Sequence, residues 1–231
     1  AGVPARLDRA RQPDARFPAD AAHELRTPLA GLHMHAQLLQ RQHPALAPAF
    51  GKLRQDVGRL TALVDSLLTL ARLDPLAQAQ LAREQVALPS LFEGLRSEFA
   101  EEAARRGIGL VLRSDIAQVD ANAQMLGIVL RNLVGNALRS CPAGSRVEVE
   151  AGRHAGRNRI SVSDDGPGVA PADMARLGER FFRVLGQEEG GSGLGLSIVR
   201  RIAALHGIAL RFGPGLGGRG LGVSLDWPEA S

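Results

Sequence analysis

The sequence has little that would cross-link it or bind it to nucleic acid. Its 231 residues include one cysteine, Cys141, so no disulfide can form within the chain, and we expect a reducing compartment. Cys141 precedes a Pro-Ala-Gly turn, where a small space-filling role is favoured over a nucleophilic one. There is no tyrosine, and Lys52 is the single lysine among scattered arginines. Nucleic-acid binders concentrate their positive charge in a patch or a helix, so we expect no nucleic-acid partner.

Long apolar runs are also missing. No stretch reaches the roughly 18 apolar residues of a membrane span, and no signal-peptide pattern is present. The net charge of +4 leaves open an acidic protein partner or a nearby anionic membrane surface. The polar tract 1–16 is interpreted as the end of an upstream connector, with an ordinary frayed terminus as the alternative.

The first half of the chain carries two apolar stripes typical of packed helices. Gaps of three and four residues alternate in both, as in helices that pack against other helices. The first stripe is Ala22, Leu25, Leu29, Leu32, Ala36 and Leu39, and the second is Phe50, Leu53, Val57, Leu60, Val64, Leu67 and Ala71. A break at His43-Pro44 and Pro48 separates them. Two such helices cannot bury these stripes alone, so the pattern predicts a two-chain, four-helix bundle.

The first helix carries an unusual histidine. His23 follows a stripe residue directly, so it is rotated by about 100° from the buried stripe toward solvent. Pro28 cannot donate an N–H to the carbonyl of Glu24, which predicts a weakened or bent helix beside the histidine. Glu24 can accept a hydrogen bond from the neutral imidazole, whose free pKa is about 6.5, and so raise its nucleophilicity. This pattern indicates chemistry rather than a structural histidine.

The second half predicts an α+β sandwich with helices on one face of a mixed sheet. The expected strands are 83–88, 108–112, 146–151, 159–164, 209–212 and 221–226, and the expected helices are 89–106, 121–139 and 197–206. His206 closes the last helix, where a partial positive charge would suit the helix dipole.

Three polar patterns in this half could bind a nucleotide. Asn132, Asn136 and Arg139 share one helix face that could hold a hydrated cation and phosphate oxygens, although a solvated face is the better reading taken alone. Asp164, at a strand end before two glycines, could accept a hydrogen bond from an exocyclic amine, with a plain turn as the alternative. The glycines of 191–196 open a helix whose free N–H groups favour phosphate, although a lone glycine motif is weak.

The segment between the last two patterns begins with the aromatic box 179–183. It continues through 184–190, which is rich in glycine and acid and could close over a nucleotide as catalytic lids do. A disordered surface loop is the alternative.

The order and spacing of these motifs resemble the cytoplasmic catalytic core of a bacterial two-component sensor histidine kinase. The motifs are His-Glu-Leu-Arg-Thr-Pro-Leu, Asn-Leu-x-x-Asn-Ala, Asp-x-Gly-x-Gly, Glu-Arg-Phe-Phe-Arg and Gly-Ser-Gly-Leu-Gly-Leu. The resemblance implies a dimerisation and histidine phosphotransfer domain at 17–74, a linker at 75–82 and a catalytic domain of the GHKL (Bergerat) ATP-binding fold at 83–231. It also implies that 1–16 end a HAMP-like connector.

The resemblance further implies a role for individual residues. His23 matches the phosphorylated histidine, Glu24 its general base, and Thr27 a residue that orients water when the partner is dephosphorylated. Asn136 matches the magnesium ligand. The remaining residues that match nucleotide-contacting positions are Asn132, Arg139, Asp164, Gly166, Gly168, Phe182, Arg183, Gly191, Gly193, Leu194, Gly195 and Leu196.

The implied cofactors are ATP and Mg²⁺, and the implied partners are a second copy of the chain and a cognate response regulator. Such a core autophosphorylates, passes the phosphoryl group to a regulator aspartate and often dephosphorylates the regulator. It is the cytoplasmic portion of a bacterial inner-membrane protein, attached through N-terminal segments absent here. Two departures stand out: Ser140 replaces a common aromatic residue, and Gly220-Leu221 replace threonines, which leaves backbone contacts only. A GHKL-type ATPase and an inactive dimeric scaffold are the alternatives.

Overall fold

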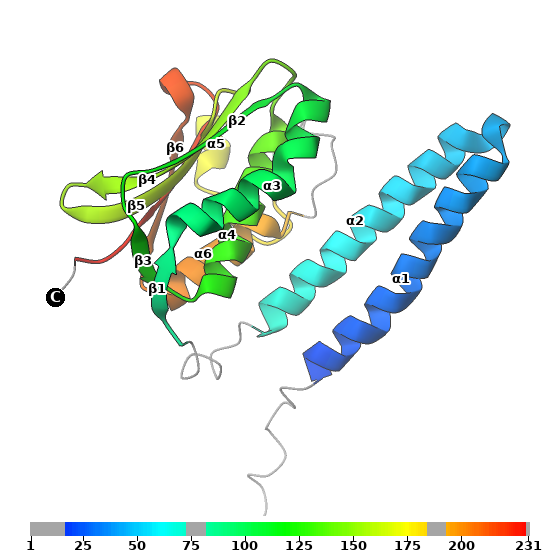
Figure 1. Cartoon of the computed structure of the whole chain (residues 1–231), viewed down its shortest axis with the longest axis horizontal. Helices are drawn as coiled ribbons and strands as arrows, with labels where there is room; N and C mark the ends of the chain where they lie inside the picture. Colours follow the sequence, from blue (N-terminus) through cyan, green and yellow to red (C-terminus); the bar gives the residue numbers. More distant parts are fainter. Residues whose placement is uncertain (1–16, 73–81, 184–192, 230–231) are drawn as a thin grey trace, which may run out of the picture. The chain divides into compact units, whose positions relative to one another are not determined.

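The computed structural model describes residues 17–72, 82–183 and 193–229. The chain divides into two compact units, 1–74 and 75–231, which are described separately. The first is a helical hairpin and the second a mixed α/β domain, as predicted (Figure 1). None of the helices in the described ranges is both long and apolar enough to cross a membrane.

The hairpin consists of two long helices joined by a tight turn. Helix α1 spans Phe17–Gln42, a 3-10 turn spans Pro44–Leu46, and α2 spans Ala47–Arg72. Pro28 lies inside α1, and the helix continues past it. Pro48 lies in the first turn of α2 rather than in the connection, because a missing N–H costs nothing at that position.

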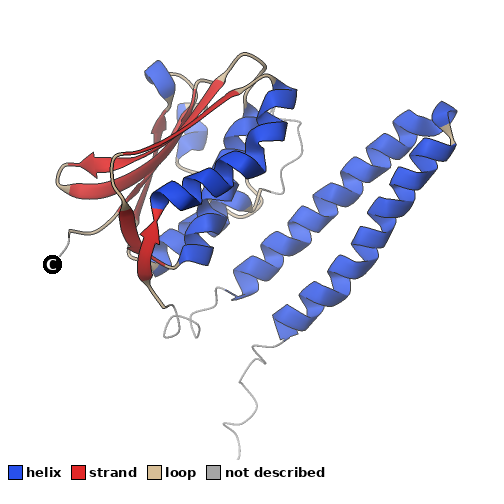
Figure 2. Ribbon diagram, in the orientation of Figure 1, coloured by secondary structure: helices blue, strands red, loops and turns tan. Residues whose placement is uncertain are grey.

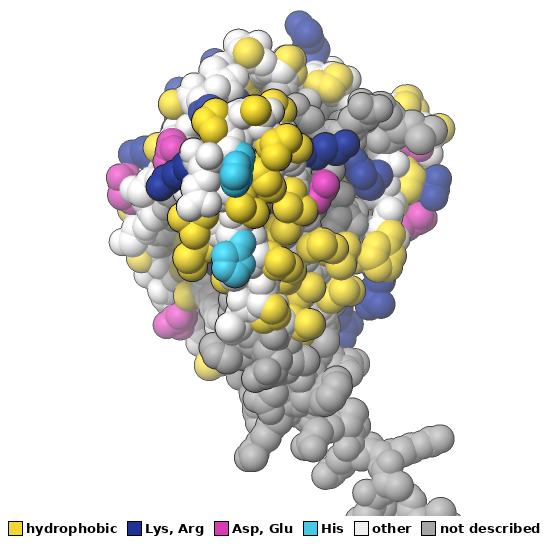
Figure 3. All heavy atoms as spheres, turned by 90° about the vertical axis from the view of Figure 1, so that its right-hand side faces the viewer, with side chains coloured by type: hydrophobic (Ala, Val, Ile, Leu, Met, Phe, Trp, Pro, Cys, Tyr) yellow, Lys and Arg dark blue, Asp and Glu magenta, His cyan; other side chains and the backbone are white. Residues whose placement is uncertain are grey.

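Part of each apolar stripe stays uncovered in the single hairpin. Ala36 and Val57 are buried. The leucines that recur every seven residues on each helix are 37–54% exposed. Figure 3 shows hydrophobic side chains gathered on one side of the hairpin. We call these residues the leucine stripes; they are Leu25, Leu32 and Leu39 on α1 and Leu53, Leu60 and Leu67 on α2. One hairpin therefore leaves a large apolar face without a cover among the described residues.

The second unit is built on a five-stranded sheet with the order β2-β4-β5-β7-β6. Strands β2 and β4 are parallel, and the other neighbours are antiparallel. The strands are β2 (Gly109–Ser114), β4 (Arg146–His154), β5 (Arg157–Asp164), β6 (Ala209–Pro214) and β7 (Leu221–Asp226). Helices α3 (Leu88–Arg106), α4 (Ala123–Ser140) and α6 (Gly195–Leu205) cover one face of the sheet (Figures 1 and 2).

Two short elements were not predicted from the sequence. Strand β3 (Gln118–Ala121) pairs with β1 (Glu84–Ala87) in a separate two-stranded sheet, and α5 is a single turn at Pro171–Met174. Both are too short for a periodic apolar pattern, and β3 is fixed by pairing with a strand far away in the sequence. The predicted helix 121–139 consequently begins at Ala123 instead.

Strand alternation explains how a carboxylate comes to lie in the core. Ile160 and Val162 of β5 point to the buried face of the sheet, and Asp164 continues the same row at the strand end. Because β5 pairs with β4 on one side and β7 on the other, Asp164 is enclosed by neighbouring strands.

The start of α4 is tied to the end of α6. Asn122 caps α4 by accepting a hydrogen bond from the Met125 N–H (3.1 Å), and its own backbone N–H donates to Nε2 of the buried His206 (3.1 Å). The other ring nitrogen of His206 lies 2.9 Å from the Ile202 carbonyl. The ring of His206 thus links the start of α4 to the end of α6.

Candidate functional site

A buried carboxylate forms the floor of the candidate site. Asp164 is 4% exposed, and its Oδ1 accepts hydrogen bonds from the backbone N–H groups of Gly166 (3.0 Å) and Leu221 (3.2 Å). Burial raises the pKa of Asp164, and these two hydrogen bonds oppose the shift. Both backbone donors bind the same oxygen, which leaves Oδ2 without either of them.

Cys141 lies against the same carboxylate. A Cβ at Gly166 would lie 2.9 Å from the Cys141 Sγ and 3.0 Å from the Asp164 Oδ1, so only glycine fits between the two groups. Burial, reinforced by the negative charge of Asp164, raises the pKa of the Cys141 thiol to about 12. The thiol therefore stays protonated and hydrogen-bonds the carboxylate instead of acting as a nucleophile. The sequence analysis did not predict that Cys141 lies next to Asp164.

A glycine-rich turn covers Asp164 from the side of β7. Gly220 has a φ of +68°, and a Cβ there would overlap the carbonyl and carboxylate oxygens of Asp164. Gly168, with a φ of +75°, lies against the Gly220 carbonyl, where a Cβ would come within 2.9 Å. The Leu221 N–H of this turn donates to Asp164, and the expectation that Gly220-Leu221 offers a nucleotide backbone contacts only stays a prediction.

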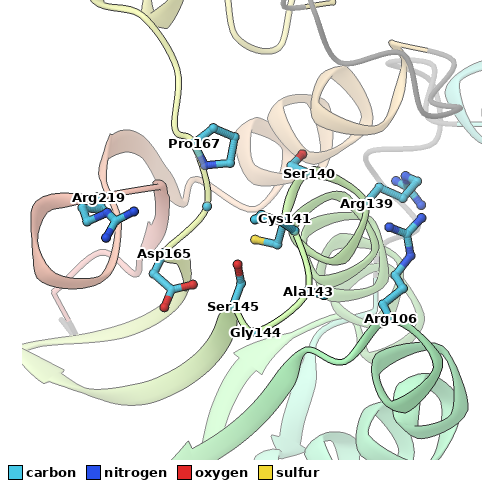
Figure 4. A pocket seen from close by; sticks show the side chains of 12 residues that line it. Arg106, Arg139, Ser140, Cys141, Ala143, Gly144, Ser145, Asp165, Pro167 and Arg219 are labelled. Atoms are coloured by element: carbon cyan, nitrogen blue, oxygen red, sulfur yellow. The ribbon is translucent and has the colours of Figure 1, made fainter.

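A cavity of about 790 Å³ opens beside this floor (Figure 4). Its walls come from the ends of α3 and α4, the loop after α4, the segment after β5 and the glycine-rich turn. The lining residues are Arg106, Arg139, Ser140, Cys141, Pro142, Ala143, Gly144, Ser145, Asp165, Gly166, Pro167 and Arg219. Three arginines against one aspartate make this cavity suitable for an anionic ligand of nucleotide size.

Ser140, which stands where related sequences often have an aromatic residue, lines this cavity. Its hydroxyl donates to the backbone carbonyl of Asn136 (2.9 Å), so it is turned onto its own helix. It therefore offers no flat surface to a ligand.

The polar face of α4 meets the start of α6. Asn132 donates through Nδ2 to the Ile128 carbonyl (2.8 Å), and a Cβ at Gly195 would lie 2.8 Å from its Oδ1. Glycine at 195 thus lets the first turn of α6 approach Asn132 closely. Leu194 is fully buried and Leu196 half-buried, so both anchor this turn.

Gly193 joins this turn to the aromatic box. It has a φ of +70° and accepts a hydrogen bond from the Phe181 N–H (3.0 Å), and a Cβ there would lie 2.8 Å from the Phe181 carbonyl carbon. The guanidinium of Arg176 lies over the ring of Phe182, with its Cζ 4.1 Å from the ring centroid. Arg183 is exposed. Gly191 and the segment 184–190 lie outside the described residues.

The histidine motif lies on α1 in the other unit. The backbone of His23 and Glu24 is helical, their side chains lie outside the described part, and Thr27 is exposed. In the described residues no group of three or more His, Cys, Asp or Glu side chains is arranged to hold a metal ion.

Two family models match the chain, one on each unit. Residues 15–76 match the His Kinase A (phospho-acceptor) domain, and residues 121–231 match the histidine kinase-, DNA gyrase B- and HSP90-like ATPase. The full-length structure of ShkA in complex with AMPPNP aligns with a TM-score of 0.71 and 32% identity over 94% of this chain and 46% of that one. The cytoplasmic segment of the histidine kinase QseC aligns with a TM-score of 0.51 and 30% identity over 75% of this chain and 95% of that one.

The chain belongs to the sensor histidine kinase family. Among curated relatives, the sensor protein kinase PmrB of Pseudomonas aeruginosa is 40% identical over 228 residues, which cover 97% of this chain and 47% of PmrB. The sensor protein QseC of Escherichia coli is 41% identical over 205 residues, which cover 87% of this chain and 44% of QseC. The kinase chain thus spans about half the length of the curated relatives it matches.

The glycine turn of the kinase chain gives a first prediction. Gly220→Ala should lower the free energy of unfolding by about 3 kcal/mol or more. The alanine would bear both the strain of a positive φ and the steric clash of its Cβ with Asp164. Gly218→Ala is the matched control, since Gly218 has a φ of +80° with nothing within 4 Å, and should cost about 1–2 kcal/mol. Fluorescence of the single, buried Trp227 during urea unfolding reports this unit. Equal costs for the two variants would contradict the described packing.

The raised pKa of Asp164 gives a second prediction. Because burial disfavours the ionised form in the folded state, Asp164→Asn should raise the free energy of unfolding of the ligand-free kinase chain at pH 7. The gain should vanish as the pH falls below about 3.9, where the aspartate is protonated in both states. Asp165→Asn, which removes a carboxylate that accepts the Arg146 N–H (2.7 Å), should give no gain. A loss of stability in Asp164→Asn at pH 7 would refute the desolvation argument.

Proposed function

We propose that this chain is a kinase core that binds Mg-ATP, phosphorylates itself on His23 and passes the phosphoryl group to an aspartate of a response regulator. The observation that carries the proposal is the buried Asp164 beside a cationic cavity, on a chain that also matches a phosphoacceptor domain. The AMPPNP complex of ShkA supports ATP as the ligand.

Asp164 would recognise the adenine base. An oxygen of its carboxylate, Oδ2, lacks the two backbone donors that bind Oδ1, and can accept a hydrogen bond from an exocyclic amine. Gly166 lines the cavity without a side chain, so a flat base can approach closely. Cys141 and the Leu221 N–H would hold the carboxylate in place.

The phosphates would extend toward α4 and the start of α6. Arg139 lines the cavity, and Asn132 lies against Gly195 at the start of α6. The free N–H groups of this helix start favour phosphate oxygens. The carboxamide oxygen of Asn136 is a hard donor that suits Mg²⁺, which keeps water and phosphate oxygens as its other ligands. Bound Mg²⁺ would offset the charge of the phosphates.

His23 would be the nucleophile. One imidazole nitrogen forms a bond to the γ-phosphorus while the bond to the bridging oxygen breaks and ADP leaves. Glu24 accepts a hydrogen bond from the other ring nitrogen and so raises the nucleophilicity of the attacking one. Thr27 is exposed next to this motif and would orient water for dephosphorylation of the regulator. The expected location, the cytoplasmic portion of an inner-membrane protein, stays a prediction.

A second copy of the chain would cover the leucine stripes. Each stripe repeats every seven residues, and a two-fold pairing of hairpins buries all of them in one four-helix bundle. The apolar stripes thus favour a homodimer over a monomer.

The kinase proposal predicts the fate of radiolabelled ATP incubated with the full chain and Mg²⁺. The wild type should gain an acid-labile, base-stable label, His23→Gln should gain none, and Asn136→Ala should label about 100-fold more slowly or worse. Label on His23→Gln would overturn the proposal. ATP hydrolysis without any label would favour a GHKL-type ATPase, and the absence of both would favour an inactive scaffold.

The dimer proposal predicts the effect of a charge in a stripe. Leu60→Glu should weaken dimerisation by about three orders of magnitude, because each copy loses about 2 kcal/mol of apolar burial. Gln55→Glu adds the same charge at an exposed position of α2 that lies about 200° around the helix from Leu53, and should leave the dimer intact. Sedimentation velocity measures both. A monomeric wild type, or a dimeric Leu60→Glu at concentrations near the wild-type Kd, would argue against the bundle.

A further inference from the structure

Helices α3 and α4 share two similar arginine–glutamate arrangements. Arg131 of α4 lies 3.8 Å from Glu98 of α3. Nearer the C-terminal ends of both helices, Nε of Arg106 on α3 lies 3.5 Å from Oε1 of Glu102. The charges of both groups shift the pKa of Arg139 on α4. Glu98, Glu102 and Arg106 follow each other at intervals of four residues, so they share one face of α3.

Each α4 arginine folds back over a glycine four residues earlier. A Cβ at Gly127 would lie 3.3 Å from Nη2 of Arg131, and a Cβ at Gly135 would lie 3.1 Å from Nη1 of Arg139. Glycine inside a helix costs about 1 kcal/mol relative to alanine, but here it makes room for a guanidinium. The two arginines are therefore positioned by the same local device.

The two arrangements differ in what they face. Arg106 and Arg139 line the cavity, and Figure 4 shows their guanidinium groups side by side at one end of it. Arg131 is not among the lining residues. Burial lowers the pKa of Arg139, the Glu102 carboxylate raises it, and the positive charge of Arg106 lowers it. The described residues thus place two guanidinium groups, from α3 and α4, at this end of the cavity.

We propose that Arg106 is a second phosphate-binding residue of this kinase, and that Glu102 competes with the nucleotide for Arg106 and Arg139. The proposal rests on the proposed function, in which ATP occupies the cavity. It goes further because Arg106 comes from α3, outside every motif that the sequence singled out.

The Glu102 pairing is suited to exchange. The shortest distance in the pair, 3.5 Å between Nε of Arg106 and Oε1 of Glu102, is longer than that of a tight charge-assisted hydrogen bond. The Glu102 and Arg106 side chains are 31% and 26% exposed, so their charges are only partly screened. A phosphate group offers more acceptor oxygens and more negative charge than Glu102, so it can displace the carboxylate from Arg106 and replace its electrostatic effect on Arg139. Glu102 thus stabilises the ligand-free state more than the bound state.

Titration calorimetry of the full chain with ATP, ADP and adenosine tests this assignment. Arg106→Gln should bind ATP and ADP about tenfold more weakly and adenosine as the wild type does. Arg106→Lys keeps the charge and should recover part of the loss. Glu102→Gln should bind ATP a few-fold more tightly, because the competing carboxylate is gone. Arg131→Gln is the matched control, and it should bind all three ligands like the wild type.

Several results would overturn the assignment. They are wild-type ATP affinity in Arg106→Gln, an equal loss for adenosine, an equal loss in Arg131→Gln, or weaker ATP binding in Glu102→Gln. Trp227 fluorescence during thermal unfolding verifies that each variant is folded. A wild type that binds no ATP contradicts the proposed function and this assignment together, whereas ATP binding that is insensitive to Arg106 contradicts this assignment alone.

Discussion

The site depends on one arrangement, the buried carboxylate of Asp164 held by the N–H groups of Gly166 and Leu221. These donors come from two places in the chain, and the Leu221 contact spans 57 residues of sequence. A carboxylate inside a protein is costly unless it is hydrogen-bonded, so the surrounding chain has to approach it closely. That approach leaves no space for a Cβ at Gly166 or Gly220. The glycines around Asp164 are thus a consequence of the buried charge.

Helix α4 connects this floor to the rest of the domain. Its apolar face packs into the core, where Leu130, Val134 and Leu138 are fully buried. Its opposite face carries Asn132 and Asn136, and its last turn carries Arg139. The N-terminal end is fixed by Asn122 and His206. The same helix therefore packs into the core and carries the proposed phosphate-binding side chains. Its rigid backbone fixes the position of these side chains relative to the core.

Local patterns explain what the sequence could predict. The heptad spacing of the leucine stripes, the alternation that ends at Asp164 and the glycine-led start of α6 all depend on neighbours in the chain, so the elements and their faces were predictable. The assignment of roles to His23 and Asn136 depended on the order of the motifs and stays a prediction.

Other features depend on tertiary contacts that have no local pattern. Strand β3 is defined by pairing with β1, and His206 is held by its contact with the Asn122 N–H. Cys141 was interpreted as a space-filling residue, and only the fold brings it to Asp164. Arg106 belongs to no motif of the sequence, and only the fold brings it to the cavity that Arg139 also lines.

In the proposed function, Asp164 binds the exocyclic amine of adenine through its carboxylate. Calorimetric titration of the wild-type chain with ATP and with inosine triphosphate tests it most directly, because the two differ at the purine 6-position, where an oxygen replaces the amine. ATP should bind about tenfold more tightly or better, since the oxygen cannot donate a hydrogen bond to the carboxylate. Equal affinities for the two nucleotides would contradict it.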